Sequence, residues 1–136
     1  CSPVATAFAQ GKDEIVPVKP NTIAKSLAIG NPADGPYALD IIRKTGGSAA
    51  GISDEDIVAA MKLLARTEGI FTETAGGATI GALTKLAREG KIGKDELTVA
   101  YITGNGYKTV EAIIPTLPKP PVIKPTVKDV EAVLGR

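Results

Sequence analysis

The residues best suited to hold a small ligand form a short glycine-rich segment, Thr103-Gly104-Asn105-Gly106. It follows residues 97–102, an apolar run that predicts a strand covered on both faces. In α/β sheets, ligands collect beyond the carboxyl ends of strands, and glycines there let the backbone approach a ligand closely. Thr103 would offer a hydroxyl and Asn105 an amide from fixed positions. A glycine-rich turn without a ligand explains the same four residues, and on this motif alone it is the favoured interpretation.

Two further segments have the composition of ligand-binding loops. The small residues Ala75 to Ala78 precede a predicted helix, where free amide groups would suit an anion or a closely packed ring. Glu73, just upstream, is either a buried acid or, more commonly, a solvent-facing residue. The segment 29–32 (Ile-Gly-Asn-Pro) predicts a turn, because Pro32 disfavours helical geometry at the residue before it. Close packing of a helix on a sheet explains residues 75–78 at least as well, and an ordinary Asn-Pro turn explains residues 29–32. Together with Thr103–Gly106, however, the segments indicate a small-molecule cleft.

Composition narrows the chemistry. The chain has 136 residues, 43% of them hydrophobic and 23% charged, with a net charge of +1. It has one cysteine, Cys1, and no histidine. Histidine-dependent nucleophilic catalysis and cysteine-rich zinc sites are therefore excluded, and we expect no metal site. The even charge balance argues against nucleic acid, and no apolar run approaches the roughly 20 residues of a membrane span. A cytoplasmic protein is expected, and the start at Cys1 suggests a piece of a longer chain.

The elements that must position these residues follow from periodicity and capping. Strands are expected at residues 15–18, 49–52, 69–74 and 97–102, and helices at 3–10, 37–44, 127–134 and in two longer segments that end at Gly69 and Gly90. The clearest helix begins after Ser53, an N-cap residue, with Asp56 in the reciprocal capping position. Its expected inward face is Ile57, Ala60, Met61 and Leu64, and that of the following helix is Ile80, Leu83, Leu86 and Ala87. Strands alternating with helices predict an α/β layer architecture.

Three ordered segments resemble one family. Residues 22–33 (TIAKSLAIGNPA), 68–77 (EGIFTETAGG) and 103–109 (TGNGYKT) are similar to threonine synthases, in that family's order and spacing. The resemblance implies a fold-type II pyridoxal-phosphate enzyme with a tryptophan synthase β-like large domain, three layers deep around a mostly parallel sheet. Residues 1–114 would be the C-terminal part of the catalytic domain. Residues 115–136 would form a proline-rich connector and a terminal helix.

The resemblance also implies a function. Threonine synthases are pyridoxal-phosphate-dependent lyases that convert O-phosphohomoserine and water to threonine and phosphate. By resemblance, Thr103 would place its hydroxyl against the pyridine nitrogen, and Ser26 would lie against the cofactor ring. The full set of implied cofactor-binding residues is Thr103, Gly104, Asn105, Ser26, Gly30, Asn31 and Glu73. Thr74 and Tyr107 depart from the family's usual proline and leucine without removing any of these groups.

The resemblance also implies that two parts of the cofactor site are absent from this chain. In this family the lysine that holds the cofactor covalently, and the loop that binds its phosphate, precede the region represented here. No catalytic residue is therefore expected in this chain, and alone it should be inactive. A serine/threonine dehydratase, a cysteate synthase or a non-catalytic structural module are the alternatives. Surface meant for the missing part would be apolar, so a homodimer or other self-association is expected.

Overall fold

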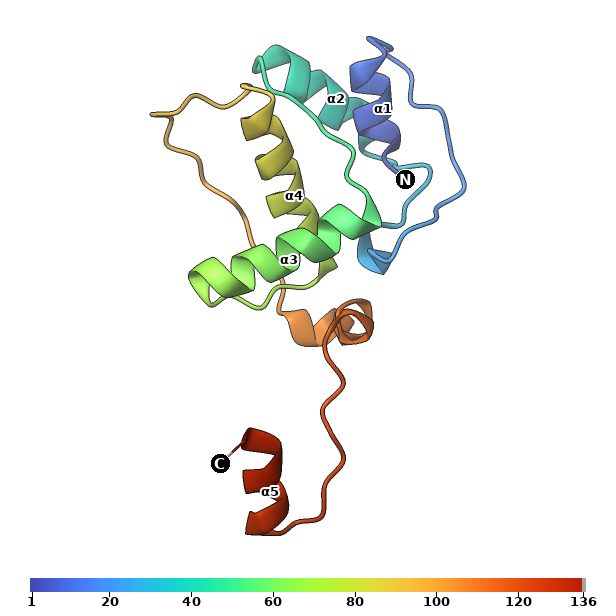
Figure 1. Cartoon of the computed structure of the whole chain (residues 1–136). Coiled ribbons are helices and arrows are strands. Elements are labelled where there is room, and N and C mark those ends of the chain that lie inside the picture. The colour runs from blue at the N-terminus through green and yellow to red at the C-terminus, as the bar shows by residue number, and fades with distance from the viewer. Residues whose placement is uncertain (136) are drawn as a thin grey trace.

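The computed structural model describes residues 1–135, and the regular structure within them is helical. Two longer helices, α3 and α4, pack together at the centre of the body, while α1 and α2 form a smaller pair beside them (Figure 1). The α-helices are α1 (Pro3–Ala9), α2 (Gly35–Lys44), α3 (Asp54–Glu68), α4 (Thr74–Arg88) and α5 (Val127–Leu134), and the 3-10 helices are η1 (Lys25–Leu27), η2 (Gly106–Ala112) and η3 (Ile114–Thr116).

Helix α3 forms where the sequence predicts it. The Ser53 hydroxyl accepts the Asp56 N–H at 3.1 Å, which satisfies one of the amide groups left free at a helix start. Gly69 ends the helix in the left-handed conformation, which glycine adopts without steric cost. The expected inward face is confirmed, because all four of its members are buried: Ile57, Ala60, Met61 and Leu64.

Helix α4 lies against α3 through small residues. A β-carbon added to Gly77 would lie 2.6 Å from Met61 Cγ and 2.8 Å from the Ile57 carbonyl oxygen. The small-residue segment is therefore the first turn of α4, not a lead-in to it. Of the inward face expected for this helix, Ile80 is buried, whereas Leu83 and Leu86 are only half-buried and Ala87 is exposed. The close approach moves the buried face toward the glycines, so that it consists of Thr74, Gly76, Gly77, Ile80 and Gly81.

The expected parallel sheet is not found among residues 1–135. The one β-type pairing there is an isolated antiparallel bridge between Thr72 and Asn105. The segments 15–18, 49–52 and 97–102 have no strand neighbour, and a strand requires one because its backbone donors and acceptors are satisfied across the ladder. These strand predictions are thus corrected for the chain by itself.

The last four residues of segment 97–102 nevertheless keep a strand-like alternation, whereas Leu97 and Thr98 are both exposed. Ala100 and Ile102 pack against the cluster of Ala60, Leu64 and Ile80 between α3 and α4. Leu97, Val99 and Tyr101 are 92%, 71% and 78% exposed. One face of the segment therefore covers the helix pair, and the other presents large apolar side chains to solvent.

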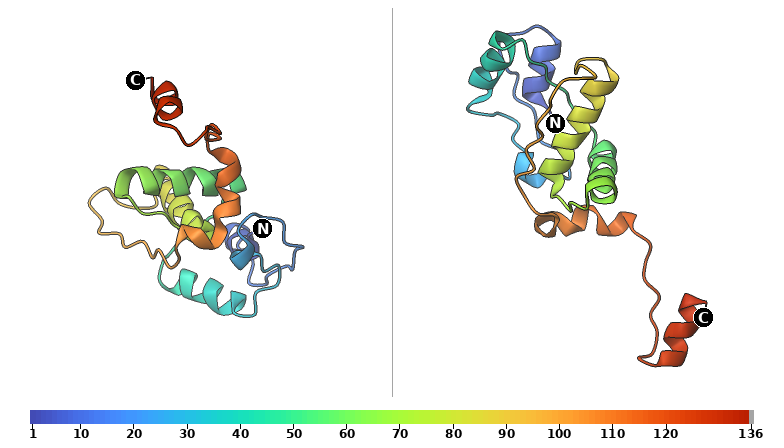
Figure 2. Two further views of the ribbon diagram at one scale, coloured as in Figure 1. Left: turned by 90° about the horizontal axis from the view of Figure 1, so that it is seen from below. Right: turned by 90° about the vertical axis from the view of Figure 1, so that its left-hand side faces the viewer.

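The end of the chain leaves the body. Residues 117–126 run outward without regular structure, and α5 lies beyond them (Figures 1 and 2). The Thr126 hydroxyl accepts the Asp129 N–H at 3.2 Å, as expected for the capped terminal helix. The division at residue 115 into two domains stays a prediction.

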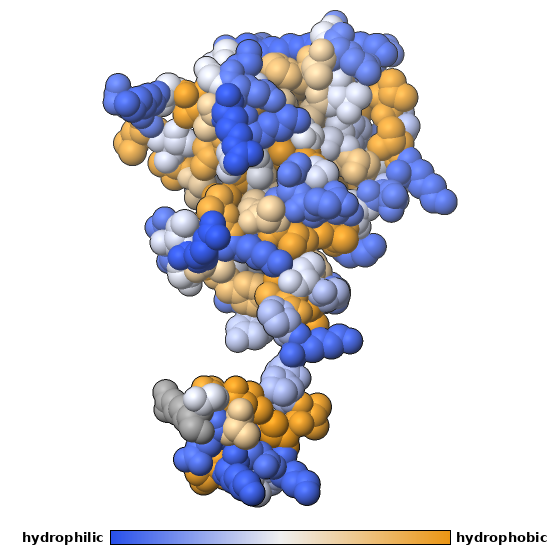
Figure 3. Space-filling model, in the orientation of Figure 1, coloured by the Kyte–Doolittle hydropathy of each residue, from blue (hydrophilic) through white to orange (hydrophobic). Residues whose placement is uncertain are grey.

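The surface is mixed in hydropathy. The space-filling view shows apolar residues interspersed with charged ones on the body, and apolar side chains gathered on part of α5 (Figure 3). No helix in the described part of the chain combines the length and the hydrophobicity needed to cross a bilayer.

The contact at Gly77 makes a testable prediction. Gly77→Ala should lower the free energy of unfolding by about 1–3 kcal/mol through overpacking, although alanine is the better helix former by about 1 kcal/mol. The matched control is Gly81→Ala in the same helix, where the added carbon would lie 2.9 Å from the Ile52 side chain, which can move, and 3.8 Å from Ala60 Cβ, an ordinary contact. Urea unfolding followed by circular dichroism measures both. Equal stability of the two variants would show that the helices do not approach as closely as described.

Candidate functional site

Two segments from distant parts of the sequence meet at the N-terminal end of α4. Residues 71–73 lie beside residues 104–106, so that Glu73 N–H donates to the Gly104 carbonyl at 3.1 Å and Gly106 N–H donates to the Phe71 carbonyl at 2.9 Å. The Thr72 hydroxyl, fully buried, also donates to the Gly104 carbonyl at 3.1 Å, and this is the third bond between the two segments. These bonds fix the loop that begins at Thr103 onto the start of the helix.

The glycines of this loop are required by the side chains opposite. A β-carbon on Gly104 would lie 1.8 Å from Glu73 Oε1, and one on Gly106 would lie 2.6 Å from the Phe71 ring. The Phe71 ring also meets Tyr107 edge to face, with 5.6 Å between the ring centroids. The loop glycines thus let protein side chains approach, and the space beside them is already filled by those side chains.

Glu73 is a buried acid. Its side chain is 6% exposed and accepts a bond from Lys108 Nζ at 3.0 Å, while the Lys108 side chain is 63% exposed. The carboxylate also lies at the start of α4, where the helix dipole favours negative charge. The expectation of a solvent-facing glutamate is thus corrected. Nothing in the local sequence indicates that Lys108 has a buried partner, because 35 residues separate it from Glu73.

A buried threonine pair lies beneath this contact. Thr74 N–H donates to the Thr109 hydroxyl at 3.1 Å, and both residues are buried. The Thr74 hydroxyl is also buried, and it has no hydrogen-bond partner among the described residues. Sequence reasoning missed Thr109, because its partner is 35 residues away.

Thr103 and Asn105 lie on the outer side of the same loop. Both are exposed, and no hydrogen bond of the Thr103 hydroxyl occurs within residues 1–135. The Asn105 side-chain oxygen accepts the Tyr107 N–H at 3.0 Å and so caps η2. Thr103 therefore keeps a free hydroxyl in a fixed position, whereas one group of Asn105 is occupied by the capping bond.

The other implied cofactor residues are placed differently. Ser26 is exposed on η1, a 3-10 helix that contacts α4. Gly30 is buried against Val18, whose carbonyl oxygen would lie 1.7 Å from an added β-carbon. Val18 N–H also donates to the Gly30 carbonyl at 3.0 Å, and Asn31 is exposed beside it. Within the described chain, no hydrogen bond connects Ser26, Gly30 or Asn31 to the Thr103 loop.

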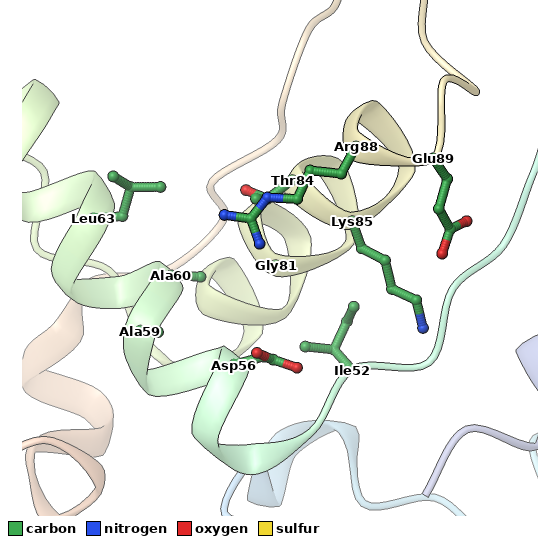
Figure 4. Close-up of a pocket in the computed structure, with 10 residues that line it drawn as sticks. All are labelled: Ile52, Asp56, Ala59, Ala60, Leu63, Gly81, Thr84, Lys85, Arg88 and Glu89. Atoms are coloured by element: carbon green, nitrogen blue, oxygen red, sulfur yellow. The ribbon is translucent and has the colours of Figure 1, made fainter.

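A separate groove runs between α3 and α4. Figure 4 shows Lys85 and Arg88 extending from α4 toward the side of the groove formed by Ile52 and α3. Lys85 Nζ donates to the Gly51 carbonyl at 3.1 Å, which ties α4 to the segment before α3. None of the implied cofactor residues lines this groove. Residues 1–135 also contain no cluster of acidic, cysteine or histidine side chains that would hold a metal ion.

Comparison with known proteins gives a consistent result. Residues 1–104 match the family model described as pyridoxal-phosphate dependent enzyme. A threonine synthase of Methanocaldococcus jannaschii is 48% identical over 113 residues, which cover 82% of this chain and 28% of that protein. A threonine synthase of Methanosarcina acetivorans is 38% identical over 136 residues, 98% of this chain and 34% of that protein. The chain therefore spans between a quarter and about a third of the length of the curated relatives it matches.

The threonine pair offers a matched test. Thr109→Val should lower the free energy of unfolding by about 1–3 kcal/mol, because the Thr74 N–H would be left buried without an acceptor. Thr74→Val removes a hydroxyl that has no partner, so it should leave stability unchanged or raise it. Both variants are compared with the parent chain by urea unfolding. A Thr74→Val chain as damaged as Thr109→Val would contradict this arrangement.

Proposed function

Because this chain belongs to the pyridoxal-phosphate dependent enzyme family, we propose that it is the C-terminal part of a threonine synthase. The complete enzyme would convert O-phosphohomoserine and water to threonine and phosphate. The observation that carries this proposal is the 48% identity to the Methanocaldococcus jannaschii enzyme, which extends over most of the chain. The three segments that resemble threonine synthases all fall within residues 22–109.

The donor set around Thr103 suits the cofactor. A pyridine nitrogen needs one hydrogen-bonding partner, and the Thr103 hydroxyl is exposed at the end of an extended segment. A hydroxyl is neutral, so unlike an aspartate it does not enforce protonation of the ring. Gly104 and Asn105 would flank the same ring, while Glu73 stays behind the loop with its charge balanced by Lys108. The cofactor, when bound, supplies the electron sink for the reaction.

The protein's own contribution is to hold this hydroxyl in place. Glu73 N–H and the Thr72 hydroxyl both bind the carbonyl of Gly104, the residue after Thr103. A side chain whose position is fixed before the ligand arrives loses less entropy on binding. We assign Ser26, Gly30 and Asn31 to the same cleft by resemblance, with Gly30 held by Val18.

The remainder of the enzyme would complete the sheet. We propose that the extended segments 15–18, 49–52 and 97–102 pair with strands from the rest of the protein, giving the mostly parallel, three-layer large domain of fold-type II enzymes. The exposed side chains of Leu97, Val99 and Tyr101 support this, since a second layer would bury them. Until they are buried they favour self-association, and a homodimer is our proposal for the complete enzyme.

The remainder would also supply the covalent attachment of the cofactor. Among the lysines of the chain, Lys108 is paired with Glu73, and Lys85 is bonded to the Gly51 carbonyl in a different groove. Lys25 lies exposed on η1. We therefore propose that no catalytic lysine lies in this chain and that the chain alone has no activity.

The role of Thr103 is tested in a chimera. The part of this chain that aligns with the Methanocaldococcus jannaschii enzyme replaces the matching region of that enzyme, and phosphate release from O-phosphohomoserine is measured. The chimera should be active, and Thr103→Val should reduce kcat/KM roughly 10- to 100-fold, the loss expected for one hydrogen bond of about 1.5–3 kcal/mol. The control is Thr98→Val, a threonine on the same segment that is not among the implied cofactor-binding residues, and it should retain activity. An inactive but folded chimera would contradict the proposed function.

The absence of a catalytic lysine is tested on the chain alone. After incubation with pyridoxal phosphate and borohydride reduction, peptide mass mapping should show only scattered, low-level modification of exposed lysines. Stoichiometric modification of a single lysine would mean that this chain carries its own attachment site.

A further inference from the structure

Helix α5 is formed but has no partner among the described residues. It is capped at both ends, by Thr126 and by Gly135 in the left-handed conformation. Its apolar side chains Val127, Val130 and Leu134 share one face, at i, i+3 and i+7, and all are exposed. A helix of eight residues is marginal in water by itself, so α5 needs a surface on which to bury this face.

The body carries an apolar groove of matching character. It lies between the outer face of α3 and the turns η2 and η3, and its apolar lining is Ile23, Val58, Ala59, Ala112 and Pro115. Lys62 Nζ donates to the Thr116 carbonyl at 3.0 Å, which fixes η3 against α3 and gives the groove a firm wall. None of the lining residues belongs to the unpaired segments 15–18, 49–52 or 97–102, so completing a sheet through those segments would not itself occupy the groove.

The charges around the two surfaces are mixed and in part complementary. Glu55 and Glu111 lie exposed on the rim of the groove. On the α5 side, Lys128 lies in the first turn and Lys124 precedes the helix, while Glu131 lies beside the apolar face. The groove itself also carries Lys62. Opposite charges at the rim of an apolar contact favour encounter and fix its register more than they raise affinity.

The connection between the two surfaces decides which groove α5 can enter. Segment 117–126 follows Thr116, which itself lines the groove, and it contains Pro118, Pro120, Pro121 and Pro125. Residues 118–124 are stiff and extended, and at about 3.1 Å per residue they reach roughly 20 Å. A turn then precedes α5, closed by the Thr126 N–H donating to the Lys124 carbonyl at 2.8 Å. The segment runs away from the body (Figures 1 and 2). A stiff arm that begins at a groove does not turn back into that groove, but it does reach the same groove of a neighbouring molecule.

We propose that α5 docks in the α3–η2–η3 groove of a second copy of this chain. In a two-fold arrangement each copy gives its helix and receives the other's, so both apolar faces and both grooves are buried at once. This exchange does not depend on the proposed threonine synthase activity, because it rests only on α5, the arm and the groove.

The test uses the 136-residue chain and variants of each surface. The parent chain should sediment as a dimer. Val130→Asp on α5 and Val58→Asp in the groove should each halve the sedimenting mass to that of the monomer. Val122→Asp is the matched control: Val122 is fully exposed in the arm and belongs to neither surface, so its dimer should remain. Circular dichroism of each variant checks that the helices still form.

Mixing the two disrupted variants distinguishes helix exchange from association through another surface. The intact helix of the Val58→Asp chain still fits the intact groove of the Val130→Asp chain, so the mixture should recover mixed dimers with one working contact. A monomeric parent chain would overturn the proposal, as would a mixture that stays monomeric. So would a dimer that survives both substitutions, since association would then run through a different part of the molecule, such as residues 97–102.

Discussion

The arrangement of the body depends on how closely α4 approaches α3. Gly77 leaves no room for a β-carbon against Met61 and the Ile57 carbonyl, so the helices meet almost backbone to backbone at the N-terminal end of α4. That contact determines where α4 begins, and the start of α4 determines where Glu73 and Thr74 lie. The Thr103 loop is then bonded to those residues. The absence of a side chain at Gly77 therefore helps to position the Thr103 loop, which lies more than 20 residues later in the sequence.

The start of α4 also holds a buried charge, the carboxylate of Glu73. A buried carboxylate is costly unless its charge is balanced, and here Lys108 and the start of α4 supply the balance. The lysine reaches Glu73 from the first turns of η2, the element that also carries Thr109. Residues 103–109 thus reach the helix start through a backbone bridge, an ion pair and a buried hydroxyl. Three attachments of different chemistry make a loop hard to displace as a unit.

Features that depend on neighbouring residues could be predicted from the sequence, whereas contacts between distant residues could not. The caps at Ser53 and Thr126 and the helix end at Gly69 were predictable, because each depends on residues within one turn. The buried face of α3 followed from its periodicity. The pairs Glu73–Lys108 and Thr74–Thr109 were not predictable, since no local pattern joins residues 35 positions apart. The strand predictions fail because pairing needs a neighbouring strand, and residues 1–135 do not provide one. Of the predicted strand 69–74 only Thr72 forms a β-bridge, since Gly69 is left-handed and Thr74 begins α4. The placement of Ser26, Gly30 and Asn31 against a cofactor stays a prediction.

The alternation of residues 97–102 has a consequence for how the protein avoids misassembly. An extended segment with both edges open and large apolar side chains on one face is a template on which identical chains can stack. Directly before it come Lys94, Asp95 and Glu96. When copies align in register, like charges at these positions would be brought beside one another and repel. Charges placed in this way would oppose growth of the segment into a fibril, and they would not hinder its pairing in the proposed sheet.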